Sequence, residues 1–115
     1  MIWLKNLYIT ESVRPRIQKI LKAAEADNPS GKVSAFLIML SIHPEAQLDV
    51  VSLKEISHPM YHEGSLSVIG VAGSKKEAFA LLERIASDCL KGCGDPYLKR
   101  YFSGADFVSK GEVII

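Results

Sequence analysis

The segment SVIGVAGSKKEA, residues 67–78, carries the clearest structural signal in the chain. It passes from an apolar run through small residues into a charged helix start. This strand, turn and helix pattern is typical of an α/β domain. Ser74 and Glu77 have the spacing of a capping box, which fixes where the helix begins. Gly70 and Gly73 raise a second possibility, that the turn binds a phosphate group.

The glycine spacing matches neither of two common phosphate-binding patterns. Residues 70–75, GVAGSK, are neither G-x-G-x-x-G nor the G-x-x-x-x-G-K-[ST] loop. Lys75 and Lys76 could still attract an anion to the helix N-terminus, but Glu77 competes for the same backbone N–H groups. The segment therefore predicts a capped corner, with an anion site as the alternative.

Downstream of this corner the sequence predicts one long helix. Gly92 and Gly94 are suited to end it in a left-handed conformation. Residues 97–102 are expected to add one helical turn, and the tail, residues 103–115, to form an edge strand or a dimer contact. The apolar stripe of the long helix consists of Ala78, Leu82, Ile85 and Cys89.

Upstream of the corner, apolar runs flank a second helical stripe. Residues 1–9 and 33–42 are apolar on both alternating faces and are predicted as strands of a sheet interior. A helix is expected between them, starting after Thr10, Glu11 and Ser12. The apolar stripe of this helix consists of Val13, Ile17, Ile20, Leu21 and Ala24.

Residues 44–56 decide between two architectures. Pro44 and Glu45 suit the first turn of a short helix. The chain then has the order β-α-β-α-β-α, forming one α/β domain over residues 1–102 with a mainly parallel sheet of three to four strands and helices packed on it. Residues 47–56 could instead be a strand, which gives a ferredoxin-like α+β arrangement.

Composition restricts the classes of partner. With 115 residues and a formal net charge of +1, the chain predicts one domain and gives no reason to expect nucleic acid or an acidic membrane surface. The longest uncharged run, residues 33–44, is too short to span a bilayer. Lys5 and Asn6 interrupt the apolar N-terminal stretch, unlike a signal peptide, and two cysteines suit a reducing compartment, so a cytoplasmic location is expected.

A mainly parallel sheet would gather polar residues at one edge. The carboxyl ends of parallel strands share that edge, and ligands of open α/β sheets bind there. The set would suit a small anionic ligand, and His43 with Glu11 could do acid–base chemistry. Hydroxyl and acidic residues at such turns also serve simply as helix caps. The residues expected at this edge are Thr10, Glu11, Ser12, Ser41, His43, Gly73, Ser74 and Lys75.

Metal and thiol chemistry have weaker signals. His58 and His62 have the i, i+4 spacing of two ligands on one helix face, but Pro59 and Gly64 oppose a helix there. Cys89 lies on the apolar stripe near a helix C-terminus, where the dipole disfavours a thiolate, and it is predicted as core. No bound metal or cofactor is therefore expected.

Three functional hypotheses remain open from the sequence. The first is a non-enzymatic interaction or accessory protein that self-associates as a homodimer, because the sheet has few strands and residues 1–3 and 113–115 are apolar. The second is a binder of a small anion at the carboxyl edge. The third is a small enzyme that uses His43 with Glu11, or a metal held by His58 and His62.

Overall fold

The computed structural model describes residues 1–25, 33–41, 43, 46–57, 66–94 and 97–114. The strands are β1 (Ile2–Ile9), β2 (Phe36–Leu40), β3 (Leu48–Ser52), β4 (Ser67–Ala72) and β5 (Phe107–Val108). The helices are α1 (Ile17–Ala24), α2 (Lys75–Cys93) and α3 (Leu98–Phe102), and the 3-10 turns are η1 (Arg14–Arg16), η2 (Glu55–Ser57) and η4 (Lys110–Glu112).

The five strands form one mixed sheet in the order β3-β2-β4-β1-β5. Only the β1–β4 pair is parallel among the described strands, and the other three pairs are antiparallel. The prediction of a single domain with mixed α/β content is confirmed. The prediction of a mainly parallel sheet with three to four strands is wrong.

The error comes from the segment that follows β2. Residues 48–52 are a strand, not the continuation of a helix, because they pair antiparallel with β2 from Phe36 opposite Ser52 to Leu40 opposite Leu48. The chain therefore turns straight back after β2, where a parallel sheet would need a crossover. Three strands lie between α1 and α2, so the element order also differs from the ferredoxin-like βαββαβ pattern.

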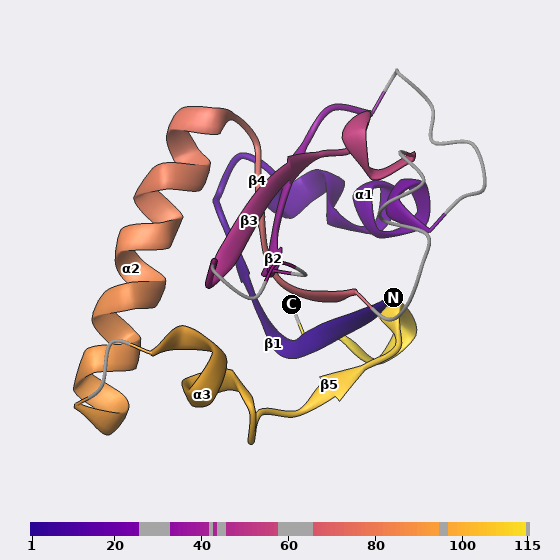
Figure 1. Cartoon of the computed structure of the whole chain (residues 1–115). Coiled ribbons are helices and arrows are strands. Elements are labelled where there is room, and N and C mark those ends of the chain that lie inside the picture. The colour runs from indigo at the N-terminus through magenta and orange to yellow at the C-terminus, as the bar shows by residue number, and fades with distance from the viewer. Residues whose placement is uncertain (26–32, 42, 44–45, 58–65, 95–96, 115) are drawn as a thin grey trace.

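The helices lie on opposite sides of the sheet, with α2 to the left of the strands and α1 to the right in Figure 1. Residues 68–72 of β4 are all buried, as expected of a central strand covered on both faces. Gly70 lies beneath α2, since a Cβ built on it would be 3.3 Å from Cδ2 of Leu81. The predicted stripe of α1 is buried on the other side, at Ile17, Ile20, Leu21 and Ala24.

The ends of the helices follow local sequence rules in part. α2 begins as predicted, with the Ser74 hydroxyl accepting a hydrogen bond from the Glu77 N–H, and it ends at Gly94, whose φ of 68° is left-handed. α1 begins at Ile17, later than the predicted start at Val13. Pro15 lies in η1, and no side chain caps that turn.

The tail folds back along the outer edge of β1. β5 pairs antiparallel with β1, with Trp3 opposite Val108. The Lys5 N–H donates to the carbonyl of Asp106 at 2.9 Å, and the Lys5 carbonyl accepts from the Ile114 N–H at 2.7 Å. Within the described part of the chain, no helix has the length and apolar character needed to cross a membrane.

Candidate functional site

The parallel pair at the centre of the sheet brings two of the three predicted turns together. β1 and β4 run side by side, so the turns that follow them emerge at the same edge. The N–H of Gly73 donates to Oγ1 of Thr10 at 3.2 Å, which ties the two turns directly. Ser41 and His43 are not part of this group, because β2 is antiparallel to β4 and ends at the opposite edge.

Three hydroxyls and one carboxylate form what we call the hydroxyl cluster: Thr10, Ser12, Ser74 and Glu77. The Ser12 hydroxyl donates to Oε1 of Glu77 at 2.7 Å, and the Ser74 hydroxyl donates to Oε2 at 3.2 Å. Oγ of Thr10 and Oγ of Ser12 lie 3.5 Å apart. Residues 10–12 were considered as caps of the first helix, but Thr10 and Ser12 instead bond to the corner that starts α2.

The hydroxyl cluster favours the ionised form of Glu77. The largest effect is the hydrogen bond from Ser12, which lowers the pKa of this carboxyl. The pKa is lowered further by hydrogen bonds with Thr10 and Ser74 and by the charge of Arg16, while desolvation raises it. A negative charge at this position also interacts favourably with the N-terminus of α2. The hydroxyls of Ser12 and Ser74 beside this helix start thus already donate to a carboxylate of the protein itself.

Gly73 allows a close approach of side chains at this corner and does not supply a special backbone conformation. The φ of Gly73 is not in the left-handed region. Among the described residues, only Gly94 has a left-handed φ. A Cβ on Gly73 would overlap with Oγ of Ser12 and lie 3.2 Å from Oε2 of Glu77. The glycine that suggested a phosphate loop thus allows the turn after β1 to approach the start of α2.

The other two predicted residues of this edge lie outside the cluster. Glu11 is exposed and forms an ion pair of 3.1 Å with Arg14, three residues along the same turn. Such an exposed pair contributes about 0–1 kcal/mol to stability. Lys75 is the first residue of α2 and is exposed.

His43 and Ser41 belong to the loop between β2 and β3. The Ser41 hydroxyl accepts from the His43 N–H at 3.0 Å, and the His43 carbonyl accepts from the Lys99 ammonium at 2.9 Å. These contacts attach the loop to α3. Because Glu11 follows β1 at the other end of the sheet, the structure does not bring His43 and Glu11 together.

The two histidines considered as metal ligands, His58 and His62, lie outside the described residues. Within the described ranges, no group of three or more His, Cys, Asp or Glu side chains could hold a metal ion. Cys89 is buried in α2, as predicted.

Comparison of the chain with protein-family models, with curated proteins and with solved structures finds no match. The functional argument for this protein therefore rests on its own residues and their geometry.

A second polar contact links β1 to α2 and was not predicted. The Tyr8 hydroxyl donates to Oδ2 of Asp88 at 2.6 Å, and the Arg84 guanidinium lies 5.5 Å from the centre of the Tyr8 ring. Burial raises the pKa of Tyr8, and the hydrogen bond to Asp88 acts in the same direction. Tyr8 and Asp88 are 80 positions apart, so no local pattern in the sequence could have paired them.

The hydroxyl cluster predicts how stability depends on pH. The pKa of Glu77 in the folded protein lies below its ordinary value of 4.5, so its ionised form contributes stability that is fully present above that value and is lost as the pH falls through the folded pKa. The stability difference between the wild type and Glu77→Gln should therefore be larger at neutral pH than in acid.

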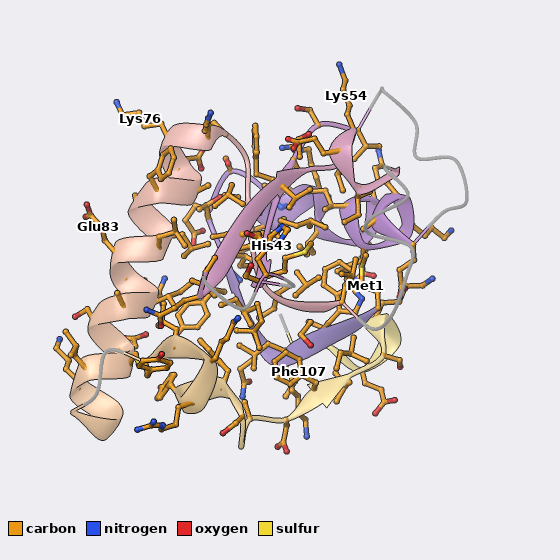
Figure 2. The ribbon with its side chains drawn as sticks, viewed as in Figure 1. Met1, His43, Lys54, Lys76, Glu83 and Phe107 are labelled. Carbon is orange, nitrogen blue, oxygen red and sulfur yellow. The ribbon has the colours of Figure 1, made fainter. Side chains whose placement is uncertain are left out.

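Urea unfolding of both proteins across this acidic range measures the difference. Glu83→Gln is the matched control, because Glu83 is on the same helix and points away from the protein in Figure 2. A difference between Glu77→Gln and the wild type that stays constant with pH would contradict the role given to the cluster.

Proposed function

We propose that the protein is a non-enzymatic interaction module that pairs with a second copy of itself through the open edge of β3. The observation that carries the proposal is the position of β3 as the outermost strand of the sheet. In Figure 1, β3 lies across the front of the sheet with no described helix over it. Open edges readily pair with another strand, and proteins that remain monomeric protect them.

The hydrogen-bond pattern identifies which backbone groups of β3 face outward. The Leu53 N–H donates to the Ala35 carbonyl, and the Ser41 N–H donates to the Gln47 carbonyl. Bonded pairs alternate along an antiparallel ladder, so Asp49 and Val51 bond to β2 while Leu48 and Val50 point their N–H and C=O groups outward. Among the described residues, these outward groups have no hydrogen-bond partner.

The sequence of β3 is compatible with pairing to a copy of itself. In an antiparallel pair centred on Val50, Val50 lies opposite Val50 of the second copy, and Leu48 lies opposite Ser52. Asp49 then lies opposite Val51, so the only charged side chain of the strand does not face its own copy. Such a two-fold contact is self-complementary, as closed homodimers require.

The side chain of Glu55 limits the length of this ladder. Its Oε1 accepts from the Ser52 N–H at 3.3 Å, and the Ser52 hydroxyl accepts from the Glu55 N–H at 3.2 Å. The end of β3 is therefore already capped, and the bonds centred on Val50 are the ones open to a partner. A short ladder of this kind favours a weak, concentration-dependent dimer over a permanent one.

Val50→Pro is the variant that tests the proposal. Proline removes the outward N–H of Val50, which the bonding to β2 does not use, and proline is tolerated at such edge positions. Sedimentation velocity of the wild type from about 10 µM to about 1 mM, a range that covers weak association, is expected to show a growing dimer. Val50→Pro should remain a monomer with the wild-type circular dichroism spectrum.

Two further variants keep the result decisive. Val50→Thr retains both the N–H and the β-branched shape, so it is the matched control and should dimerise like the wild type. Val50→Lys places two ammonium groups opposite each other across the two-fold axis and should weaken the dimer even if the proline variant fails to fold. A wild type that stays monomeric throughout, or a folded Val50→Pro that dimerises normally, would refute the proposal.

The alternative of an anion-binding module has less support. Its site would be the N-terminus of α2, where the hydroxyls of Ser12 and Ser74 already donate to Glu77. An incoming anion would have to displace this carboxylate or lie beside it, and like charges in one site repel.

A further inference from the structure

We propose that a cleft beside β1 binds a zwitterionic amino acid with an aromatic side chain. The cleft has a volume of about 530 Å³, within the range of small-molecule sites in proteins. It lies between β1, α3 and the turn at residues 104–106. The side chains used in the argument are those of Lys5, Asn6, Tyr8, Tyr101 and Asp106.

An irregularity in β1 forms one wall of this cleft. Trp3 is opposite Val68 and Tyr8 is opposite Gly70, so four residues of β1 (4–7) stand against one residue of β4 (69). The Lys5 backbone bonds instead to Asp106 and Ile114 of the tail. This is an unusually long bulge for a parallel pair, and bulges in general are over-represented beside active sites, where they redirect side chains. Here the bulge lies where Lys5, Asn6 and Tyr8 line the cleft.

The aromatic side chains of the cleft are held in place. The Tyr8 hydroxyl is fixed by Asp88 at 2.6 Å, and Arg84 lies over the ring at 5.5 Å. The rings of Tyr101 and Phe102 pack edge to face, with centroids 4.9 Å apart. Fixed aromatic surfaces of this kind pack well against another apolar ring.

The polar groups of the cleft carry one positive and one negative charge. Lys5 and Asp106 are adjacent across the backbone bond of 2.9 Å, yet no ion pair joins their side chains. Within the described part of the chain, the side chains of Lys5, Asn6 and Asp106 make no hydrogen bond or ion pair. An ammonium, an amide and a carboxylate are thus open to a ligand.

A zwitterion satisfies this combination better than a singly charged molecule. The carboxylate of an amino acid can accept from the Lys5 ammonium and the Asn6 amide, and its ammonium group can donate to the Asp106 carboxylate. A simple anion would face Asp106, and a simple cation would face Lys5. An aromatic side chain on the ligand would occupy the surface formed by Tyr8 and Tyr101.

Titration with L-phenylalanine, followed by amide NMR shifts, tests the proposal on the whole chain. Saturable shifts are expected at residues 4–8 and 101–106 by about 10 mM ligand, a concentration that detects millimolar affinity. Phenethylamine lacks the carboxylate and 3-phenylpropionate lacks the ammonium group. Each analogue should bind at least about tenfold more weakly than L-phenylalanine, because the loss of a hydrogen bond to a charged group lowers affinity by about this factor.

Two charge-removing variants assign the contacts. Lys5→Gln and Asp106→Asn should each weaken phenylalanine binding about tenfold. Only Lys5→Gln should also weaken 3-phenylpropionate, because that analogue has no ammonium group to meet Asp106. Lys54→Gln, an exposed site beyond β3 whose side chain points away from the protein in Figure 2, is the control and should bind normally.

The proposal is overturned by absent shifts, by shifts that map outside the cleft, or by unchanged binding in both Lys5→Gln and Asp106→Asn. Val50→Pro retains every cleft residue, so repeating the titration with that variant separates ligand binding from self-association.

Discussion

Trp3→Ala is expected to lower the free energy of unfolding by about 3–5 kcal/mol, the range for removing a large buried aromatic side chain. Trp3 is fully buried in β1, between β4 and β5 in the sheet. A loss of this size is a large share of the about 5–15 kcal/mol that stabilises a typical domain. Urea unfolding followed by circular dichroism is the measurement, since Trp3 is the only tryptophan and its fluorescence disappears with the substitution.

Trp3→Phe should be far less destabilising than its size change suggests. The indole N–H of Trp3 is buried and has no hydrogen-bond partner among the described residues. An unsatisfied buried donor costs about 1–3 kcal/mol, and phenylalanine removes that cost while keeping most of the packing. The loss should therefore stay well below the about 3–5 kcal/mol expected for Trp3→Ala. If Trp3→Phe loses as much as Trp3→Ala, the N–H makes a contact that matters for stability.

Gly73→Ala is expected to have the second largest effect, about 1–3 kcal/mol of destabilisation, as for other overpacked sites. The added Cβ would overlap with Oγ of Ser12 and crowd Oε2 of Glu77 at 3.2 Å. The Ser12 side chain must then rotate and give up its hydrogen bond to Glu77, or the turn after β1 must move away from the start of α2. Thermal and urea unfolding of Gly73→Ala measure the cost.

Ser12→Ala should rescue this variant in part. It removes the overlapping oxygen and leaves the Ser12 Cβ at 3.4 Å from the new methyl group, which is close to an ordinary contact. Gly73→Ala should therefore cost at least about 0.5 kcal/mol less in the Ser12→Ala background than in the wild type, as expected of residues in direct contact. Equal costs in the two backgrounds would show that the overlap with Ser12 is not the cause.

Local patterns were sufficient to predict the elements around the corner at residues 67–78. The apolar run predicts β4, and Ser74 with Glu77 predicts the start of α2, because both depend only on neighbours in sequence. Gly94 ends α2 for the same kind of reason, since its left-handed φ is a local property. β2 and the buried stripe of α1 were also found from their own periodicity.

Strand pairing could not be predicted in the same way. Residues 48–52 fit either a short helix or a strand until the partner is known, and pairing with β2 decides the matter. With residues 48–52 as a strand, β2 runs antiparallel to β4, not parallel to it as predicted. Ser41 and His43 therefore lie at the opposite edge of the sheet from Thr10. Two of the eight residues predicted at the carboxyl edge, including the only histidine among them, thus lie elsewhere because of the direction of a single strand.

The sequence predicted which residues meet after the two parallel strands, β1 and β4. Thr10, Ser12, Gly73 and Ser74 do come together, because β1 and β4 are parallel. The hydrogen bonds among these residues were not predicted, since nothing in the sequence shows that Ser12 donates to Glu77, 65 positions away. The cleft beside β1 had no sequence signal, because the bulge that opens it depends on pairing with β4 and β5.

The position of β1 in the sheet also has a consequence for how the protein is made. Its partners lie 65 positions (2 to 67) and 105 positions (3 to 108) further along the chain. β2 and β3, by contrast, meet across a short loop and can pair early. During synthesis, β1 therefore cannot pair until most of the chain has followed it, and Trp3 and Leu4 stay uncovered until then. In this interval a chaperone would have an apolar segment to bind.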